Sequence, residues 1–440
     1  MLSIKQAKEL YEYHKTNELP RLQKLYNYFI GKHDILNKQD RKGKVDTKAV
    51  NNFARYISTI STGYFIGNPV TYVSTENEFE EMQNVLEKND EQTVNYNNAL
   101  NCSIFGKAYE LQYYDENGDY NFIDLDTRNV IVITDSKVKP KITDAIIFSE
   151  TPTKENKLLV KMDIYDDMNV QKYEFTVDRS QSENKSFDYK FIDEEAHDFN
   201  GVPVVEYKNN TFSLGDYETV ISLIDAYNDA VSTNIDDLKD FTDAFLALRN
   251  MSGTEQADID AAKSSKTLLL DDDGDAFWLV KNVNDSYSEN IKNRIKEDIH
   301  KFSFVPDMSD KNFGNNLSGV AIKYKLLALE QLRGQKSRMF KKGLVSRLNF
   351  MADYLAKTGD GAFAHDMVKI QFNENVPKNL LEMADMISKL HGIVPTEYLY
   401  GELPMIQDVQ HAMELMEEEE SKKLVSVPYE FNNQEVNNDE

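Results

Sequence analysis

The most constraining feature of the sequence is a long stretch without helix-breaking residues. From Asp216 to Asn250 there is neither glycine nor proline, and at 1.5 Å rise per residue an uninterrupted helix over this stretch would be about 50 Å long. Its apolar residues recur on one face at helical spacing, at Ile224, Val231, Ile235, Leu238, Phe245 and Leu248. We therefore predict one long amphipathic helix over residues 214–250.

The same helix carries a second, acidic stripe. Its members follow spacings of four, seven, four and three residues, which place them on one side of a helix: Asp225, Asp229, Asp236, Asp240 and Asp243. Two interpretations stay open, a solvated face or a face that looks onto a charged partner or a lumen.

A compact insert, residues 251–285, follows this helix. "TEQADIDAAKSS" predicts a short helix, and "KTLLLDDDGDAFWLV" predicts a hairpin whose turn holds Asp271, Asp272, Asp273, Gly274 and Asp275. The alternating aspartates suggest an EF-hand, but Ala276 stands where the loop needs glycine and Asn282 where it needs the bidentate glutamate. No metal site is therefore expected.

A second long helix is expected over residues 286–303, with Ser286 and Glu289 spaced as a capping box. A polar loop, 304–317, and a third long helix, 318–357, follow; the helix has a local basic bias at Lys336, Arg338, Lys341, Lys342 and Arg347. After residues 358–377, which include a strand near 367–373, the pattern predicts helix over 378–420 and a disordered polar tail over 421–440.

The N-terminal part, 1–213, is predicted to be one α+β domain. Residues 3–30 are expected to be helical, with Ser3 and Gln6 as a capping box. A run without charged residues, 56–75, continues a predicted helix that has one apolar face of Phe53, Ile57, Ile60 and Tyr64. A turn at Gly67 and Pro69 and then a strand are expected to follow. Strands are expected at 107–114, 120–125, 129–134, 157–165, 170–177 and 202–207, with a hairpin turn at Asn117-Gly118 between the first two. The polar stretch 178–200 is expected to be a loop.

Charge and motifs exclude several functions. Acidic residues outnumber basic ones by 75 to 50, for a net charge of −25, which opposes tight duplex binding through phosphate contacts. No Walker A, HExxH or GxSxG motif occurs, and the single cysteine, Cys102, permits no intrachain disulfide and is expected to be a small buried residue. No secretory signal is expected in "MLSIKQAKELYEYHK". A metal-dependent nuclease built on Asp271–Asp273 remains the one enzymatic alternative; we expect no enzyme and no cofactor.

Three stretches in this order resemble a known family. "VNNFARYISTISTGYFIGNPVTY" (50–72), "LIDAYNDAVSTNIDDLKDFTDAFLALRN" (223–250) and "IKEDIHKFSFVPDMSDKNFGNNLSGVAIKYKLLALEQ" (295–331) are similar to signature segments of the bacteriophage portal (head-tail connector) proteins of long-tailed phages of Gram-positive hosts. The similarity extends over nearly the whole chain and is weakest at the termini and at 178–200.

The resemblance implies an α+β portal fold assembled as a ring of about twelve subunits. Residues 1–213, completed by the strand near 367–373, would form the wing. Residues 214–250 and 286–303 would form the stem, 251–285 a small α/β clip, 304–317 the tunnel loop, 318–357 the helix behind it, 358–377 the return to the wing, and 378–420 the crown.

The resemblance also implies partners and sites. Double-stranded DNA would pass through the channel without tight binding, because an acidic lining repels it. A terminase motor, a head-completion or adaptor protein, and the major capsid and scaffolding proteins would dock on the ring, in a virion assembled in the host cytoplasm; no membrane is involved. The tunnel loop would present a polar, mobile segment: Asp307, Met308, Ser309, Asp310, Lys311, Asn312 and Phe313. The clip interface would use Asp271, Asp272, Asp273, Phe277 and Trp278. The competing class is a virion structural protein without a DNA channel.

Overall fold

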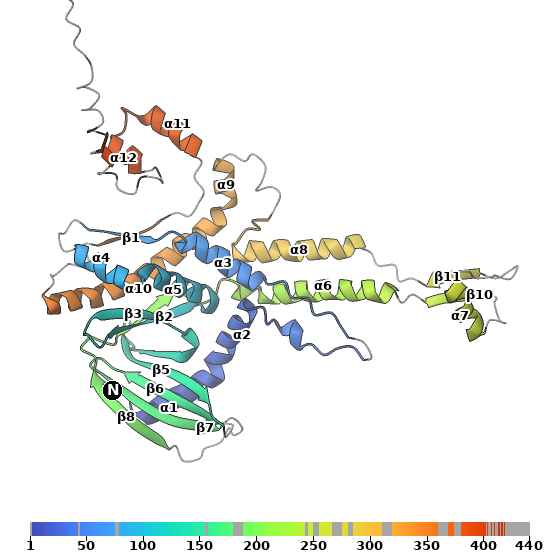
Figure 1. Cartoon of the computed structure of the whole chain (residues 1–440), viewed down its shortest axis with the longest axis horizontal. Coiled ribbons are helices and arrows are strands. Elements are labelled where there is room, and N and C mark those ends of the chain that lie inside the picture. Colours follow the sequence, from blue (N-terminus) through green and yellow to red (C-terminus); the bar gives the residue numbers. More distant parts are fainter. Residues whose placement is uncertain are drawn as a thin grey trace, which may run out of the picture. The chain divides into compact units, whose positions relative to one another are not determined.

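The structure is a computed structural model in which two compact units are distinguished, 1–313 with 325–375, and 314–324 with 376–440 (Figure 1). It describes residues 2–42, 45–74, 79–154, 157–178, 188–242, 245–249, 255–265, 275–279, 285–309, 319–359, 368–373 and 380–401, and isolated positions between 403 and 418. Helices and sheets are both abundant, which confirms the α+β fold class.

The N-terminal helices follow the sequence prediction closely. Helix α1 (Ile4–Tyr13) continues through a π-helical turn (His14–Glu18) into α2 (Leu19–Phe29). The predicted capping box is present, with the Ser3 hydroxyl accepting from the backbone of Gln6 and the Gln6 side chain accepting from the backbone of Ser3. This box satisfies donors that the first helical turn leaves unpaired.

The neutral run forms the predicted helix, turn and strand. Helix α3 spans Phe53–Ile66 and strand β1 spans Val70–Val73. The predicted buried face of α3 was wrong: the helix is rotated about its axis relative to the prediction, and of the four predicted residues only Ile57 is fully buried. The buried side chains include Ala54, Ile57, Ser58, Ser61, Thr62 and Phe65. Small polar residues let this helix approach its neighbours closely, while Phe53, Ile60 and Tyr64 are only half-buried. The late strand β12 (Lys369–Phe372) pairs with β1 in antiparallel register.

Two antiparallel sheets make up the β-rich part. One has the order β3 (Tyr120–Leu125), β2 (Lys107–Tyr114), β9 (Val204–Lys208), with the predicted tight turn at Gly118. The other has five strands in sequential order, β4 (Val130–Thr134), β5 (Ile142–Pro152), β6 (Lys157–Tyr165), β7 (Asn169–Asp178) and β8 (Tyr189–Ala196).

Two of these strands differ from the prediction. The sequence reading omitted β5, and it assigned the region of β8 to a loop. β8 is exposed along its whole length and is held by backbone pairing to β7. Its charged residues Lys190, Asp193, Glu194 and Glu195 are therefore accommodated in solvent on an edge strand.

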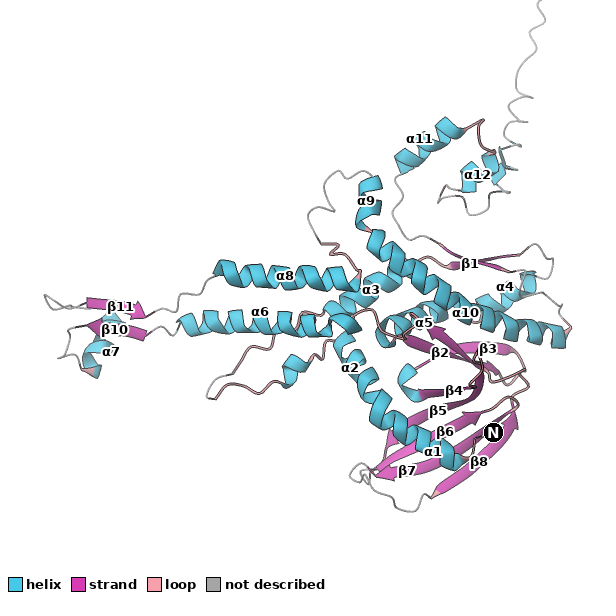
Figure 2. Cartoon of the chain, turned by 180° about the vertical axis from the view of Figure 1, so that it is seen from behind, coloured by secondary structure: helices cyan, strands magenta, loops and turns pink. Residues whose placement is uncertain are grey.

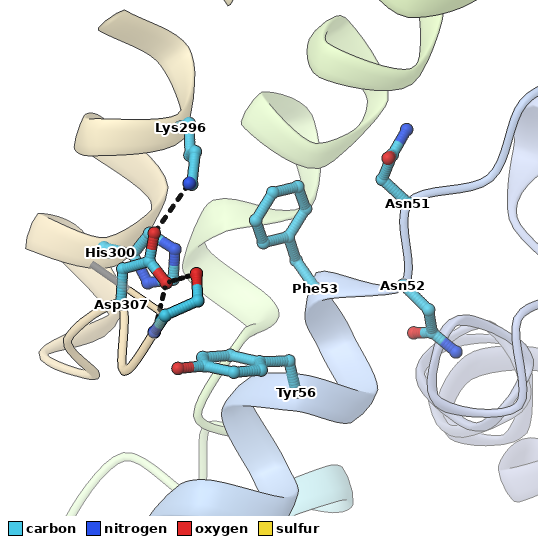
Figure 3. Close-up of a pocket in the computed structure, with 8 residues that line it drawn as sticks. Asn51, Asn52, Phe53, Tyr56, Lys296, His300 and Asp307 are labelled. Atoms are coloured by element: carbon cyan, nitrogen blue, oxygen red, sulfur yellow. Dashed lines mark hydrogen bonds and ion pairs between the residues drawn. The ribbon is translucent and has the colours of Figure 1, made fainter. Parts of the chain in front are cut away.

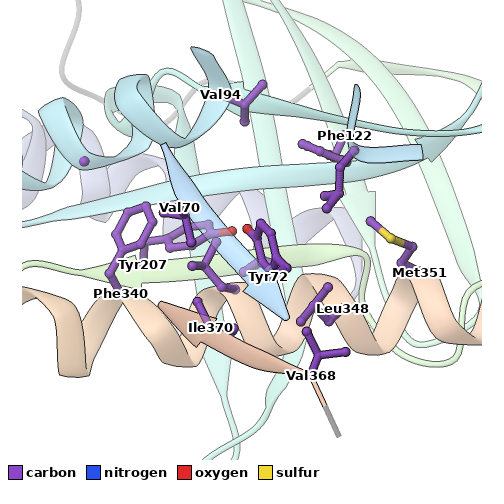
Figure 4. Close-up of a cluster of buried hydrophobic side chains, with 14 of the residues drawn as sticks. Val70, Tyr72, Val94, Phe122, Tyr207, Phe340, Leu348, Met351, Val368 and Ile370 are labelled. Atoms are coloured by element: carbon purple, nitrogen blue, oxygen red, sulfur yellow. The ribbon is translucent and has the colours of Figure 1, made fainter. Parts of the chain in front are cut away.

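The largest core surrounds one long helix, α10 (Leu327–Thr358). Phe340, Leu348 and Met351 of this helix share one buried cluster with residues of β1, β12, β9 and α5 (Glu91–Phe105) (Figure 4). Met82 and Leu86 of α4 (Phe79–Lys88) belong to the same cluster. Within this core the Arg347 guanidinium donates to Glu110 (Nε to Oε1, 2.8 Å) and to Asn95 (2.8 Å). Cys102 is buried nearby as predicted, and burial raises the pKa of its thiol.

The long helix predicted over 214–250 is shorter than expected. Helix α6 spans Ile221–Thr242, and residues Phe245–Arg249 form strand β10, which pairs with β11 (Asp275–Leu279). The absence of glycine and proline permits a helix at 245–249, but pairing with a distant strand satisfies the same backbone groups and prevails. Helix α7 (Gln256–Ser265) matches the predicted short helix, and the first strand expected near 267–270 lies outside the described residues.

Helix α8 (Asp285–Ser303) matches the second predicted helix within one residue. The third predicted helix is divided at Leu326, into α9 (Gly319–Lys325) and α10. In the second unit, α11 (Leu380–Leu390) and α12 (Thr396–Gly401) are short helices within the predicted helical stretch 378–420. Among the helices described, none combines the length and hydrophobicity that crossing a bilayer requires.

Candidate functional site

Helices α6 and α8 lie side by side (Figure 2). Ile224 and Ile299 are buried, and Ser288 Oγ donates a hydrogen bond to Asn234 Oδ1 at 2.6 Å. Further along, Leu238 and Tyr287 are 66% and 65% exposed. The pair is thus packed at one end and presents apolar side chains to its surroundings at the other.

An extended segment, residues 45–51, runs along α6. Its alternate backbone N–H groups donate to α6 side chains: Thr47 to Asp236 (3.0 and 3.1 Å), Ala49 to Ser232 (3.0 Å) and Asn51 to Asn228 (2.8 Å). The acceptors stand four residues apart, about 6 Å along a helix, and alternate donors in an extended chain are about 6.6 Å apart. Because the two spacings match, residues 45–51 are held along α6. We call residues 45–51 the strap.

The acidic stripe of α6 contacts the chain's own N-terminal region. Asp225 accepts a hydrogen bond from the Tyr28 hydroxyl (2.6 Å), Asp229 pairs with Lys38 (2.9 Å), and Asp236 accepts from the strap. Burial and the bond to Asp225 raise the pKa of Tyr28. The side chain of Asp240 and the whole of Asp243 lie outside the described residues. The three described aspartates therefore serve intrachain contacts, an outcome that sequence spacing alone did not indicate.

The predicted tunnel loop starts from a firmly anchored base. α8 ends at Ser303, and Phe304 takes a left-handed conformation (φ +62°), which costs a bulky residue about 1–2 kcal/mol. Val305 is fully buried, and its carbonyl lies 2.9 Å from His300 Nδ1. Tyr56 of α3 completes the anchor: its hydroxyl donates to the Pro306 carbonyl (3.0 Å) and accepts from the Met308 N–H (2.8 Å).

Asp307 is the electrostatic centre of this base. Lys296 Nζ lies 2.6 Å from one carboxylate oxygen, and the Ser309 hydroxyl (2.6 Å) and N–H (3.0 Å) donate to the other. Partial burial alone would raise the pKa of Asp307, but the hydrogen bonds from Lys296 and Ser309 outweigh it and lower the pKa to about 2. These residues line an open pocket of about 260 Å³ together with Asn51, Asn52, Phe53, Tyr56 and His300 (Figure 3).

These contacts change the interpretation of the loop. We expected its polar middle, from Asp307 onward, to move without disturbing a core, but Asp307, Met308 and Ser309 are tied to α3, to α8 or to each other. The remaining predicted loop residues, Asp310, Lys311, Asn312 and Phe313, lie outside the described residues.

The predicted clip interface is described only in its backbone. Phe277 and Trp278 belong to β11, where they pair with Ala247 and Leu246. Asp271, Asp272 and Asp273 lie outside the described residues. Within the part of the chain that the structure describes, no group of three or more potential metal ligands comes together.

A buried junction precedes α6, and the sequence reading missed it. Asp216 Oδ2 accepts from Ser61 (2.6 Å), Ser103 (2.6 Å) and Lys336 (2.5 Å), and its Oδ1 accepts from Asn209 (2.8 Å). Burial opposes the charge, but Lys336 and the hydrogen bonds prevail and lower the pKa of Asp216. The junction thus ties α3, α5 and α10 to the start of α6.

Comparison with known proteins completes the description. The family described as "Phage portal protein, SPP1 Gp6-like" matches residues 8–424 of this chain. The chain belongs to this phage portal protein family. The portal protein of Bacillus phage SPP1 is 24% identical over 413 residues, covering 89% of this chain and 82% of that protein. The portal protein of Clostridium phage phiCD119 is also 24% identical, over 438 residues, covering 92% of this chain and 94% of that protein.

Membership in the phage portal family confirms the resemblance drawn from the three sequence segments. Portal proteins are structural components of the virion, so the family match favours a structural role over the nuclease alternative.

Proposed function

We propose that this chain forms a ring of about twelve copies that serves as the conduit for DNA during packaging and ejection. The match over residues 8–424 carries the proposal. The side-by-side packing of α6 and α8, with residues 243–284 inserted between them in the sequence, is consistent with a stem that bears a clip.

The parts of the ring follow from this proposal. The two sheets with β1 and β12 would form the wing, and α6 and α8 the stem. β10, α7 and β11 would form the clip, residues 304–317 the tunnel loop, and 378–420 the crown.

The chain would act as a passive platform. Its sequence lacks a Walker A motif, so a separate terminase ATPase would supply the work of packaging and dock on the ring. A head-completion protein would later occupy the same region, and capsid and scaffolding proteins would surround the wing at one vertex of the virion, after assembly in the host cytoplasm.

Low affinity for DNA would arise from the net charge of −25, which repels phosphates at long range. The aspartates of α6 would contribute less than their number suggests, because Asp229 pairs with Lys38, and Asp236 with Arg41 and Lys239. The stem face would therefore act mainly as a scaffold for the strap.

Imaging of the purified full-length chain tests the proposal. Negative-stain electron microscopy should show rings with a central hole. A purified oligomer without a hole would contradict the proposal and favour a virion structural protein without a channel.

A loop deletion tests the channel constriction. Removing 310–312 spares Ser309, which holds Asp307, so rings should form while DNA packaging or retention fails. A matched variant, Ser309→Ala, removes the hydroxyl that donates to Asp307 but leaves the loop at its full length. Normal filling of particles by the deletion variant would show that the loop is not the constriction.

A further inference from the structure

Helix α10 contrasts in charge with the rest of the chain. Between Leu327 and Asn349 it has six basic residues and one acidic residue, Glu330, in a protein whose acidic residues outnumber basic ones by 75 to 50. Three of the six are neutralised within the chain: Lys336 by Asp216, Arg347 by Glu110 and Arg333 by Glu330.

The other three basic side chains remain available. Arg338, Lys341 and Lys342 are exposed, and the described part of the chain offers them no hydrogen bond or ion pair. Lys341 and Lys342 follow Arg338 by three and four residues, so both neighbour Arg338 on the surface of α10. Lys341 and Lys342 follow Phe340, which is buried in the main core and fixes the rotation of the helix.

The exposed side chains of α10 around these three cations share one chemistry. From residue 331 to 349 of α10 every exposed side chain is an amide or a cation: Gln331, Gln335, Arg338, Lys341, Lys342 and Asn349. Successive members are mostly three, four or seven residues apart, so they form a stripe of about 27 Å along the helix.

We propose that this stripe is a contact surface for the phosphate backbone of double-stranded DNA, an inference that rests on the proposed conduit function. Arginine, lysine, glutamine and asparagine are the side chains that bind DNA phosphates without reading sequence. A second protein is a poorer fit, because interface cores favour aromatic residues and methionine and are depleted in lysine.

The stripe supports weak contact. Three cations release about three counterions, which gives a slope near −2.7 for log affinity against log salt. Between 50 and 200 mM salt this predicts an affinity loss of about 40-fold for one subunit's stripe. Such contact steadies DNA transiently against the general repulsion of an acidic chain.

The test compares three full-length proteins: wild type, Arg338→Gln/Lys341→Gln/Lys342→Gln, and the control Lys5→Gln/Lys139→Gln/Lys190→Gln. The control residues are exposed, have no partner among the described residues, and change the net charge equally. Binding of a fluorescein-labelled 30-base-pair duplex is measured from 50 to 200 mM NaCl, and assembly is measured by light scattering.

We expect a shallower salt slope for the stripe variant and a wild-type slope for the control. Equal slopes in both variants would overturn the inference. Loss of assembly in the stripe variant alone would also overturn it, since the stripe would then be a contact between copies. Absence of rings in all three proteins would count against the conduit proposal, and the slopes would still decide whether the stripe binds DNA.

Discussion

The buried pair Asp216–Lys336 gives the sharpest stability prediction. The two side chains are 1% and 3% exposed, and their charged atoms are 2.5 Å apart. In Asp216→Asn the Lys336 ammonium keeps its charge but loses its counterion in a site that excludes water. Removing one partner of such a pair costs about 3–5 kcal/mol of unfolding free energy.

A second variant separates charge from packing. In Asp216→Asn/Lys336→Met both charges are absent, and the methionine chain fills most of the volume of the lysine stem. Because replacing a whole buried pair by apolar groups is often neutral, we expect the double variant to recover most of the stability lost in Asp216→Asn.

Urea unfolding followed by circular dichroism measures both effects, and the midpoints of the three proteins are compared at constant pH. A loss below about 1 kcal/mol for Asp216→Asn, typical of an exposed pair, would refute the reasoning. So would a double variant less stable than the single one.

Three further predictions concern the loop base, the wing and the clip. The Asp307 carboxyl should titrate near pH 2 when followed by NMR, because its pKa is lowered to about 2. Lys296→Met removes the cation paired with it and should raise this titration midpoint. Because the pKa of Asp307 is lower in the folded protein, the Asp307 contribution to stability is present above about pH 4 and is lost as the pH falls toward 2. Gly106→Ala should lower the thermal midpoint markedly, since Gly106 has φ +86° and a Cβ there would lie 2.0 Å from the Ser213 carbonyl oxygen; an unchanged midpoint would contradict that close approach. Trp278→Ala should impair subunit or motor docking while the far-UV spectrum stays native, and unchanged ring formation together with unchanged packaging would argue against an interface role.

Local signals in the sequence predicted much of the wing. The capping box at Ser3, the turn at Gly118 and the bounds of β6 were all found where the pattern placed them. These features depend on residues within a few positions of each other. β8 was missed because its side chains are exposed along the whole strand, and hydrophobic patterning detects burial rather than backbone pairing.

Long-range contacts decided the features that the sequence did not reveal. Tyr56 and Pro306, which anchor the loop base, are 250 positions apart, and no local spacing links the two residues. The end of α6 is a similar case, since Phe245–Arg249 is compatible with a helix until Asp275–Leu279 supplies a strand partner. Spacing within one element carries no information about such a partner.

Charge patterns illustrate the same limit and lead to a different view of this chain's acidity. On α6 the strap binds three acceptors spaced four residues apart, and only Asp236 among them is charged; the other two are Asn228 and Ser232. Because charged and uncharged acceptors bind the strap alike, this face of α6 is better explained by hydrogen bonding to the strap than by a charged channel lining. On α10 the intrachain partners account for Arg333, Lys336 and Arg347. Arg338, Lys341 and Lys342 have no carboxylate partner among the described residues. The formal charges of the two helices thus overstate the repulsion that DNA would meet at α6 and conceal the attraction that it would meet at α10.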